Sequence, residues 1–181
     1  MSQPTVILDA CVLINLLASG EAESIIRVAA EECRICEVVE KETIYLSSDD
    51  PQEEAVEAVQ VDSLIESGLL SVCALENQAE EALYVNYASQ LDDGEAMSIA
   101  IAEARGYKIA TDDRKARRIF LEATGAPDRL IWTSDLIRKW AEQEGISPEK
   151  LQSTLQSIRR RATFFPPKRD VNHGWWTSNM S

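Results

Sequence analysis

Short apolar runs alternate with longer segments of helical periodicity along most of the chain. The apolar runs are five to seven residues long and predict buried strands at 4–9, 69–75, 107–111 and 129–133. Apolar residues spaced three and four apart predict helices at 11–20, 21–35, 47–68, 76–91, 92–106, 112–125, 134–145 and 147–162. Segment 38–46 fits a helix or a strand equally well.

The sharpest helix signal lies in residues 92–106. Asp92 or Asp93 can cap its start, and Gly106 closes its end. Its small apolar residues recur at helical spacing and form one narrow face.

Strands that are separated by helices predict a mainly parallel sheet with helices on both faces. The expected fold class is α/β, a three-layer α/β/α sandwich. We expect one domain over residues 1–145. A C-terminal helix and tail, 146–181, should dock on the same domain or on a partner, because Trp175 and Trp176 are costly to leave in water.

Acidic residues stand where the predicted strands end. Asp9 ends the first strand, and Asp112 and Asp113 follow the strand 107–111. Sites in open α/β sheets lie at the carboxyl ends of strands, so these acids should converge. Glu95, at the start of helix 92–106, should face the same cleft, and Glu42 is the expected fourth acid.

Carboxylates gathered in one place repel each other unless a cation compensates them. Oxygen-rich sites suit Mg²⁺ or Mn²⁺, which bind phosphate oxygens and activate water. The pattern therefore favours phosphodiester hydrolysis.

Two stretches, VILDACVLINLL (6–17) and DDGEAMSIAIAEARGYKIATDDRKAR (92–117), together with the order of strands and helices, resemble the PIN-domain family. The resemblance covers roughly residues 4–145. Asp9 matches the strand-end Asp, Val39 to Glu42 match a VxxE segment, and Gly94-Glu95-Ala96 match the helix start. Asp113 is the stricter match at the last strand end, with Asp112 beside it. The later stretch 130–147 resembles the end of an uncharacterised PIN-like subgroup.

The resemblance implies a metal-dependent ribonuclease, commonly the toxin of a toxin–antitoxin pair and often a homodimer. It implies catalytic roles for Asp9, Glu42, Glu95 and Asp113, and metal binding by Asp9, Glu95, Asp112 and Asp113. The cofactor would be Mg²⁺ or Mn²⁺, and the partners an RNA substrate and an antitoxin protein. The basic residues after the acidic pair could steer phosphate toward the metal: Arg114, Lys115, Arg117 and Arg118.

The chain departs from the family pattern in two ways. It is longer than PIN toxins commonly are, because it adds the segment 51–67 and the tail 147–181. A small polar residue often follows the first Asp, but Ala10 and Cys11 stand here. Asn15, one and a half helical turns on, could lie on the cleft side instead.

Simpler interpretations exist for each candidate. Asp9 and the pair Asp112–Asp113 could be helix caps, Glu95 a first-turn acid facing the helix dipole, and Glu42 a surface residue. A PIN-like module without catalysis, acting through protein contacts, is the alternative function. An aspartyl phosphotransfer enzyme is disfavoured, because Cys11 and Leu13 stand where it needs Asp and Thr.

Composition narrows the choice of partners and compartment. A net charge of −13 argues against non-specific nucleic-acid binding, although Lys and Arg concentrate in 112–118 and 158–169. No apolar run is long enough to span a membrane, and the start of the chain lacks the basic residues of a signal peptide. The four cysteines are expected to be reduced thiols in a cytoplasmic protein.

Overall fold

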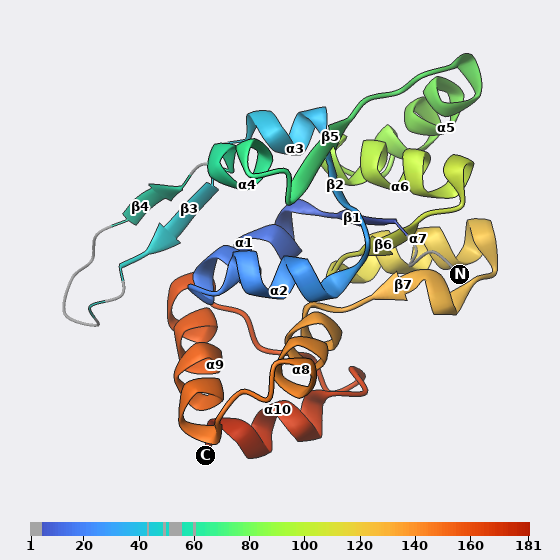
Figure 1. The fold of residues 1–181 in the computed structure, drawn as a ribbon. Helices are drawn as coiled ribbons and strands as arrows, with labels where there is room; N and C mark the ends of the chain where they lie inside the picture. The colour runs from blue at the N-terminus through green and yellow to red at the C-terminus, as the bar shows by residue number, and fades with distance from the viewer. Residues whose placement is uncertain (1–4, 43, 49, 51–55, 60) are drawn as a thin grey trace.

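The computed structural model describes residues 5–42, 44–48, 50, 56–59 and 61–181. Its centre is a five-stranded parallel sheet in the order β5-β2-β1-β6-β7 (Figure 1). The strands are β1 (Val6–Leu8), β2 (Cys33–Cys36), β5 (Leu70–Cys73), β6 (Lys108–Ala110) and β7 (Leu130–Ile131). The expected α/β class with a parallel central sheet is confirmed.

Helices flank the sheet. Figure 1 shows α5 (Gln78–Ala88) and α6 (Asp93–Arg105) above it, and α1 (Ala10–Ala18) and α2 (Ala22–Ala29) below. Beneath α1 and α2 lie α8 (Thr133–Gln143), α9 (Pro148–Ala162) and α10 (His173–Met180). The remaining helices are α3 (Glu37–Lys41), α4 (Asp62–Glu66), α7 (Arg114–Thr124) and the 3₁₀ turn η1 (Pro127–Arg129).

Helix α6 packs against the central strands of the sheet. Asp92, rather than Asp93, caps its start, and Gly106 ends it in the left-handed conformation at φ 71°. Its residues 96–102 are buried without a break. The helix therefore has a fixed position above β1, β2 and β6.

The helix predicted over 21–35 is wrong in its second half. Helix α2 ends at Ala29, Ala30 is extended, and Cys33–Cys36 form β2 between β1 and β5. Hydrogen bonding to strands on both sides outweighs the helical periodicity that continues through this stretch. All four cysteines are free thiols, as expected.

The helix predicted over 47–68 is also wrong where it can be compared. Val56–Val59 form β4, which pairs antiparallel with β3 (Ile44–Ser47), and only α4 near the end is helical. The predicted start at 51–55 lies outside the described residues, as does residue 60. The ambiguous segment 38–46 contains both the end of α3 and most of β3. The hairpin projects from the body (Figure 1).

Helix α9 packs against α1, and α10 packs against α9. Trp176 of α10 is fully buried and meets Phe164 edge to face, with ring centroids 5.6 Å apart. Asp170 and Asn172 are buried polar residues just before this helix. Among the described residues, no helix has the length and apolar character needed to cross a bilayer.

Candidate active site

Asp9 lies at the carboxyl end of the central strand β1. Its Oδ1 accepts a hydrogen bond from the Ala10 amide at 2.8 Å, and its Oδ2 accepts one from the Thr111 hydroxyl at 2.7 Å. The Cys11 thiol donates to Oδ2 at 3.2 Å. Burial raises the pKa of this carboxyl, although the three hydrogen bonds oppose the rise.

The neighbouring strand explains why Thr111 reaches Asp9. Leu8 pairs with Ala110, so the residues that follow β1 and β6 stand side by side. Chain order also reverses here, because β2 and β5 lie on one side of β1 while β6 and β7 lie on the other. Such a reversal point opens a crevice at the carboxyl edge of the sheet.

The start of α6 adds two more acids to this edge. Asp92 caps the helix by accepting from the Glu95 amide at 2.8 Å. Burial, with the negative charges of Asp92 and Asp9, raises the pKa of Glu95 to about 7. The charge of Asp113 acts on Glu95 in the same direction. These acids therefore form one electrostatic group.

Glu42 joins the group from α3, although most of its surface is exposed. A methyl group built on Gly94 would stand 3.0 Å from its Oε1, so the carboxylate lies over the start of α6. Burial raises the pKa of Glu42, and the charges of Asp92 and Asp9 add to the rise.

Asp113 caps α7. Its Oδ1 accepts from the amides of Lys115 and Ala116 at 2.7 and 2.8 Å. Its own amide donates to the Thr111 hydroxyl oxygen at 3.2 Å, which ties it to the residue that holds Asp9. One hydroxyl therefore links two of the expected acids.

Four of the expected acids thus share one negatively charged edge, and Asp92 is a fifth member that we had expected only as a cap. Its place at an N-cap three residues before Glu95 was the signal that could have identified it. Within the described part of the chain, no three His, Cys, Asp or Glu side chains are arranged to hold a metal ion as they stand. The donor set itself is oxygen-rich and carries uncompensated negative charge, which suits Mg²⁺ or Mn²⁺.

Asp112 is held by a separate set of hydrogen bonds. Its Oδ1 accepts from the Thr133 amide at 3.0 Å, and its Oδ2 accepts from the Thr133 hydroxyl at 2.6 Å and the Asn15 amide nitrogen at 3.0 Å. Burial raises its pKa to about 6 against these hydrogen bonds. Asn15, which we expected on the cleft side, therefore contacts Asp112 rather than Asp9.

The four basic residues after the acidic pair have different surroundings. Arg117 stacks on Trp132 with its Cζ 3.4 Å from the ring centroid, and it donates to the carbonyls of Thr111 and Ile131. Lys115 donates to the Gln90 carbonyl, and Arg118 pairs with Glu122. Arg114 is exposed.

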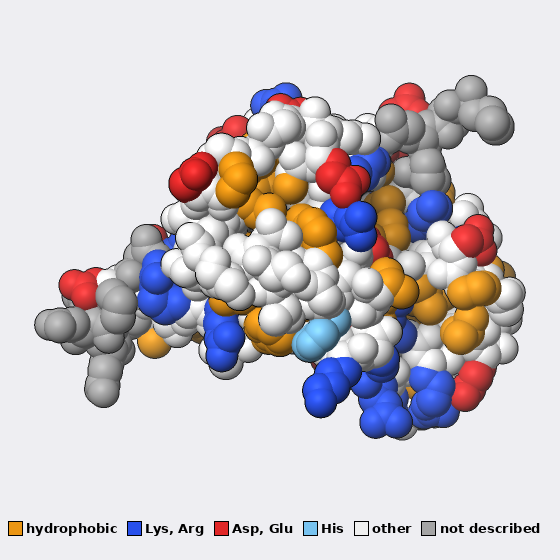
Figure 2. Space-filling model, turned by 90° about the horizontal axis from the view of Figure 1, so that it is seen from below, with side chains coloured by type: hydrophobic (Ala, Val, Ile, Leu, Met, Phe, Trp, Pro, Cys, Tyr) orange, Lys and Arg blue, Asp and Glu red, His pale blue; other side chains and the backbone are white. Residues whose placement is uncertain are grey.

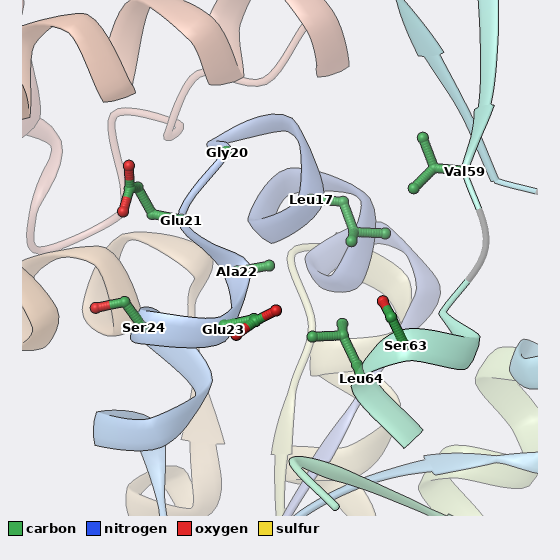
Figure 3. Close-up of a pocket in the computed structure, with 9 residues that line it drawn as sticks. All are labelled: Leu17, Gly20, Glu21, Ala22, Glu23, Ser24, Val59, Ser63 and Leu64. Atoms are coloured by element: carbon green, nitrogen blue, oxygen red, sulfur yellow. The ribbon is translucent and has the colours of Figure 1, made fainter. Parts of the chain in front are cut away.

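A hollow of about 420 Å³ lies elsewhere, at the far end of α1 (Figure 3). Leu17, Val59 and Leu64 line it with the α1–α2 turn, and none of the expected acids does. Nine helical residues separate Asp9 from this end of α1, which corresponds to about 13 Å. The acidic edge is therefore separate from this hollow.

The sequence was compared with family models, curated proteins and solved structures. A family model described as a PIN domain matches residues 5–169. The chain belongs to the PIN-domain family. No curated protein and no solved structure matches it. PIN domains are in general nucleases, so the acidic edge of this PIN domain is its candidate active site.

Proposed function

We propose that this PIN domain is a Mg²⁺- or Mn²⁺-dependent endoribonuclease that hydrolyses RNA phosphodiester bonds. The observation that carries the proposal is the convergence of Asp9, Glu42, Glu95 and Asp113 from separate elements on one sheet edge. Burial and the negative charges of Asp92, Asp9 and Asp113 raise the pKa of Glu95, and a divalent cation would relieve the repulsion between these carboxylates.

Asp9, Glu95 and Asp113 would hold the cation, with Glu42 beside them and Asp112 behind. When bound, the ion supplies Lewis-acid activation of water and neutralises charge on the phosphate. Thr111 and the Ala10 amide hold the Asp9 carboxylate in a fixed orientation. The α7 amides do the same for Asp113, so little reorganisation is needed when charge develops.

The test is cleavage of structured and single-stranded RNA with Mn²⁺, with Mg²⁺ and with chelator. Asp9→Asn and Glu95→Gln should each lower the cleavage rate by at least about 100-fold, because each removes a charged ligand. Glu81→Gln is the matched control, since Glu81 is an exposed first-turn glutamate of α5. It should retain the native rate.

Cleavage that survives in chelator, or equally in both site variants, would contradict the proposal. If the protein neither cleaves RNA nor takes up Mn²⁺ in calorimetry, the alternative is a PIN-like module that acts through protein contacts.

We further propose that the protein is the toxin of a toxin–antitoxin pair, as its membership of the PIN-domain family suggests. Induced expression should then arrest growth of a bacterial host, and Asp9→Asn should not. A homodimer is the proposed assembly, and light scattering on the purified protein measures its mass directly. Normal growth on expression of an active nuclease would contradict the toxin role alone.

A further inference from the structure

The C-terminal segment after α9 brings a second set of basic residues to the side of the candidate site. Lys168 and Arg169 are exposed, although the chain as a whole carries a net charge of −13. The Arg169 guanidinium lies over the Trp132 ring at 5.7 Å from its centroid. Arg117 lies over the same ring at 3.4 Å. Two stretches about fifty residues apart in sequence therefore meet at one tryptophan.

This meeting point is connected to the acidic edge. Arg117 donates to the Thr111 carbonyl at 2.7 Å, and the hydroxyl of Thr111 is the group that holds Asp9. Arg114, the first residue of α7, is exposed next to Asp113. Positive charge thus runs from the start of α7, past Trp132, to the C-terminal segment.

The segment that carries Lys168 and Arg169 is held rigidly. Pro166 and Pro167 precede it, and the buried Asp170 follows it. Asp170 accepts from the Ser134 hydroxyl at 2.7 Å and from the Asn172 amide at 2.8 Å. Because these groups are already ordered, a ligand would not have to immobilise the segment on binding.

Figure 2 looks onto the face over the C-terminal helices. Lys and Arg side chains gather along one edge of this face beside the histidine, and His173 is the only histidine of the chain. Such a local basic surface on an acidic protein suits a polyanion that binds at this surface rather than non-specifically over the whole protein.

We propose that Lys168 and Arg169 of the C-terminal segment bind the RNA backbone beside the active site, extending the basic surface of Arg114. The inference rests on the proposed ribonuclease function and adds a substrate-binding role for residues outside α7. The substrate class that it implies is an RNA whose phosphates lie along Arg114, Lys168 and Arg169.

The test measures binding without cleavage. A fluorescent single-stranded RNA is titrated with native protein and with the double variant Lys168→Ala/Arg169→Ala, in chelator, at several salt concentrations. The double variant should bind about five- to tenfold more weakly at moderate salt. The slope of log affinity against log salt should become shallower by about 1.4, since each lost phosphate contact removes about 0.7.

The control is Arg27→Ala/Lys150→Ala, which changes net charge equally on α2 and α9 and should bind like the native protein. Equal weakening in both variants would overturn the inference, because it would show an effect of net charge alone. Unchanged binding by the Lys168→Ala/Arg169→Ala variant would overturn it too, and so would a native protein that binds no RNA.

The cleavage assay separates this inference from the proposed function. Suppose that the native protein cuts RNA and that cutting and binding are both unaffected in the Lys168→Ala/Arg169→Ala variant. This result would support the nuclease function and contradict only the RNA-binding role of the C-terminal segment. Both pairs of residues are exposed, so thermal unfolding should show native stability in both variants.

Discussion

Single carboxylates at this site carry two roles at once. Asp113 caps α7 through Oδ1, and its charge also acts on Glu95. Asp9 likewise accepts from the first amide of α1 while it faces the acidic edge. Sequence patterns alone pose capping and ligand binding as alternatives, but the two are compatible because a carboxylate has about four acceptor positions and a cap uses only one or two of them.

Glu95 should make the folded protein more stable as pH falls, whereas a salt-bridged acid makes a protein less stable as pH falls. Its pKa rises from an ordinary 4.5 to about 7, so the folded protein binds this proton more tightly than the unfolded chain does. Stability in chelator should therefore increase as pH falls from 8 through 7 toward 5.5. After allowance for solvent screening, the gain from Glu95 is about 1 kcal/mol, or about 2–4 °C in Tm.

Thermal unfolding at pH 5.5 and pH 8 measures this dependence. Glu95→Gln should flatten the curve, and Glu81→Gln should leave it as in the native protein. Identical pH dependence in native protein and Glu95→Gln would show that the folded protein does not raise the pKa of Glu95.

Gly94 is predicted to set the position of Glu42. A methyl group there would meet Glu42 Oε1 at 3.0 Å and Val39 Cγ2 at 3.3 Å. Gly94→Ala should displace the Glu42 carboxylate and lower Mn²⁺ affinity about tenfold in calorimetry. Stability should change little, because alanine favours the helix by about 0.5–1 kcal/mol and offsets the crowding.

Gly174→Ala is the control for this substitution. Gly174 is also helical, and no atom lies within 4 Å of the position of its added methyl group. Its Mn²⁺ affinity should match that of the native protein. Unchanged affinity in Gly94→Ala would mean that Glu42 does not contribute to metal binding.

Among the elements, those with both a cap and a terminal glycine were the most predictable. Helices α6 and α7 each begin after an aspartate cap and end at a glycine with positive φ, as the sequence indicated. Strands β2 and β4 were missed, and most of β3 lay in a segment that fitted a helix or a strand equally well. Their short segments continue a helical pattern or lie among acidic residues, and only pairing with distant strands defines them.

The contacts that hold α7 in place lead to a prediction about stability. Arg117 donates hydrogen bonds to two backbone carbonyls and stacks on Trp132, whereas Arg118 faces solvent and pairs with Glu122. Arg117→Ala should lower the free energy of unfolding by about 2 kcal/mol. Arg118→Ala should change it by less than about 0.5 kcal/mol.

Urea unfolding of the two variants measures the difference. Equal effects would indicate that Arg117 is a surface residue, as its place in the basic run at first suggests. The expected phosphate-steering role of Arg117 therefore competes with a structural one.

At the scale of the whole molecule, the last helix belongs to the core. Trp176 is fully buried, and within the described residues its Nε1 has no hydrogen-bond partner. Trp176→Ala should cost about 3–5 kcal/mol. Trp176→Phe should cost about 1–2 kcal/mol, because it keeps most of the packing and removes the unpaired N–H.

Chemical denaturation of both variants checks this order, and Trp175→Ala serves as the control at a half-buried neighbour. A cost for Trp176→Ala no larger than that for Trp175→Ala would mean that α10 is a detachable appendage. The sequence showed two apolar residues in a polar tail, but it held no signal for which of them the core would take.

The strand order also determines when, during synthesis, the acidic edge can exist. Asp9 receives its hydrogen bond from Thr111, which is 102 residues further along the chain. Both neighbours of β1 must be present before the central strand is complete, and β6 is made long after β2. A nascent chain therefore carries Asp9 without the Thr111 hydrogen bond until strand β6 and the residues after it have been made. The edge can assemble only after that point of synthesis.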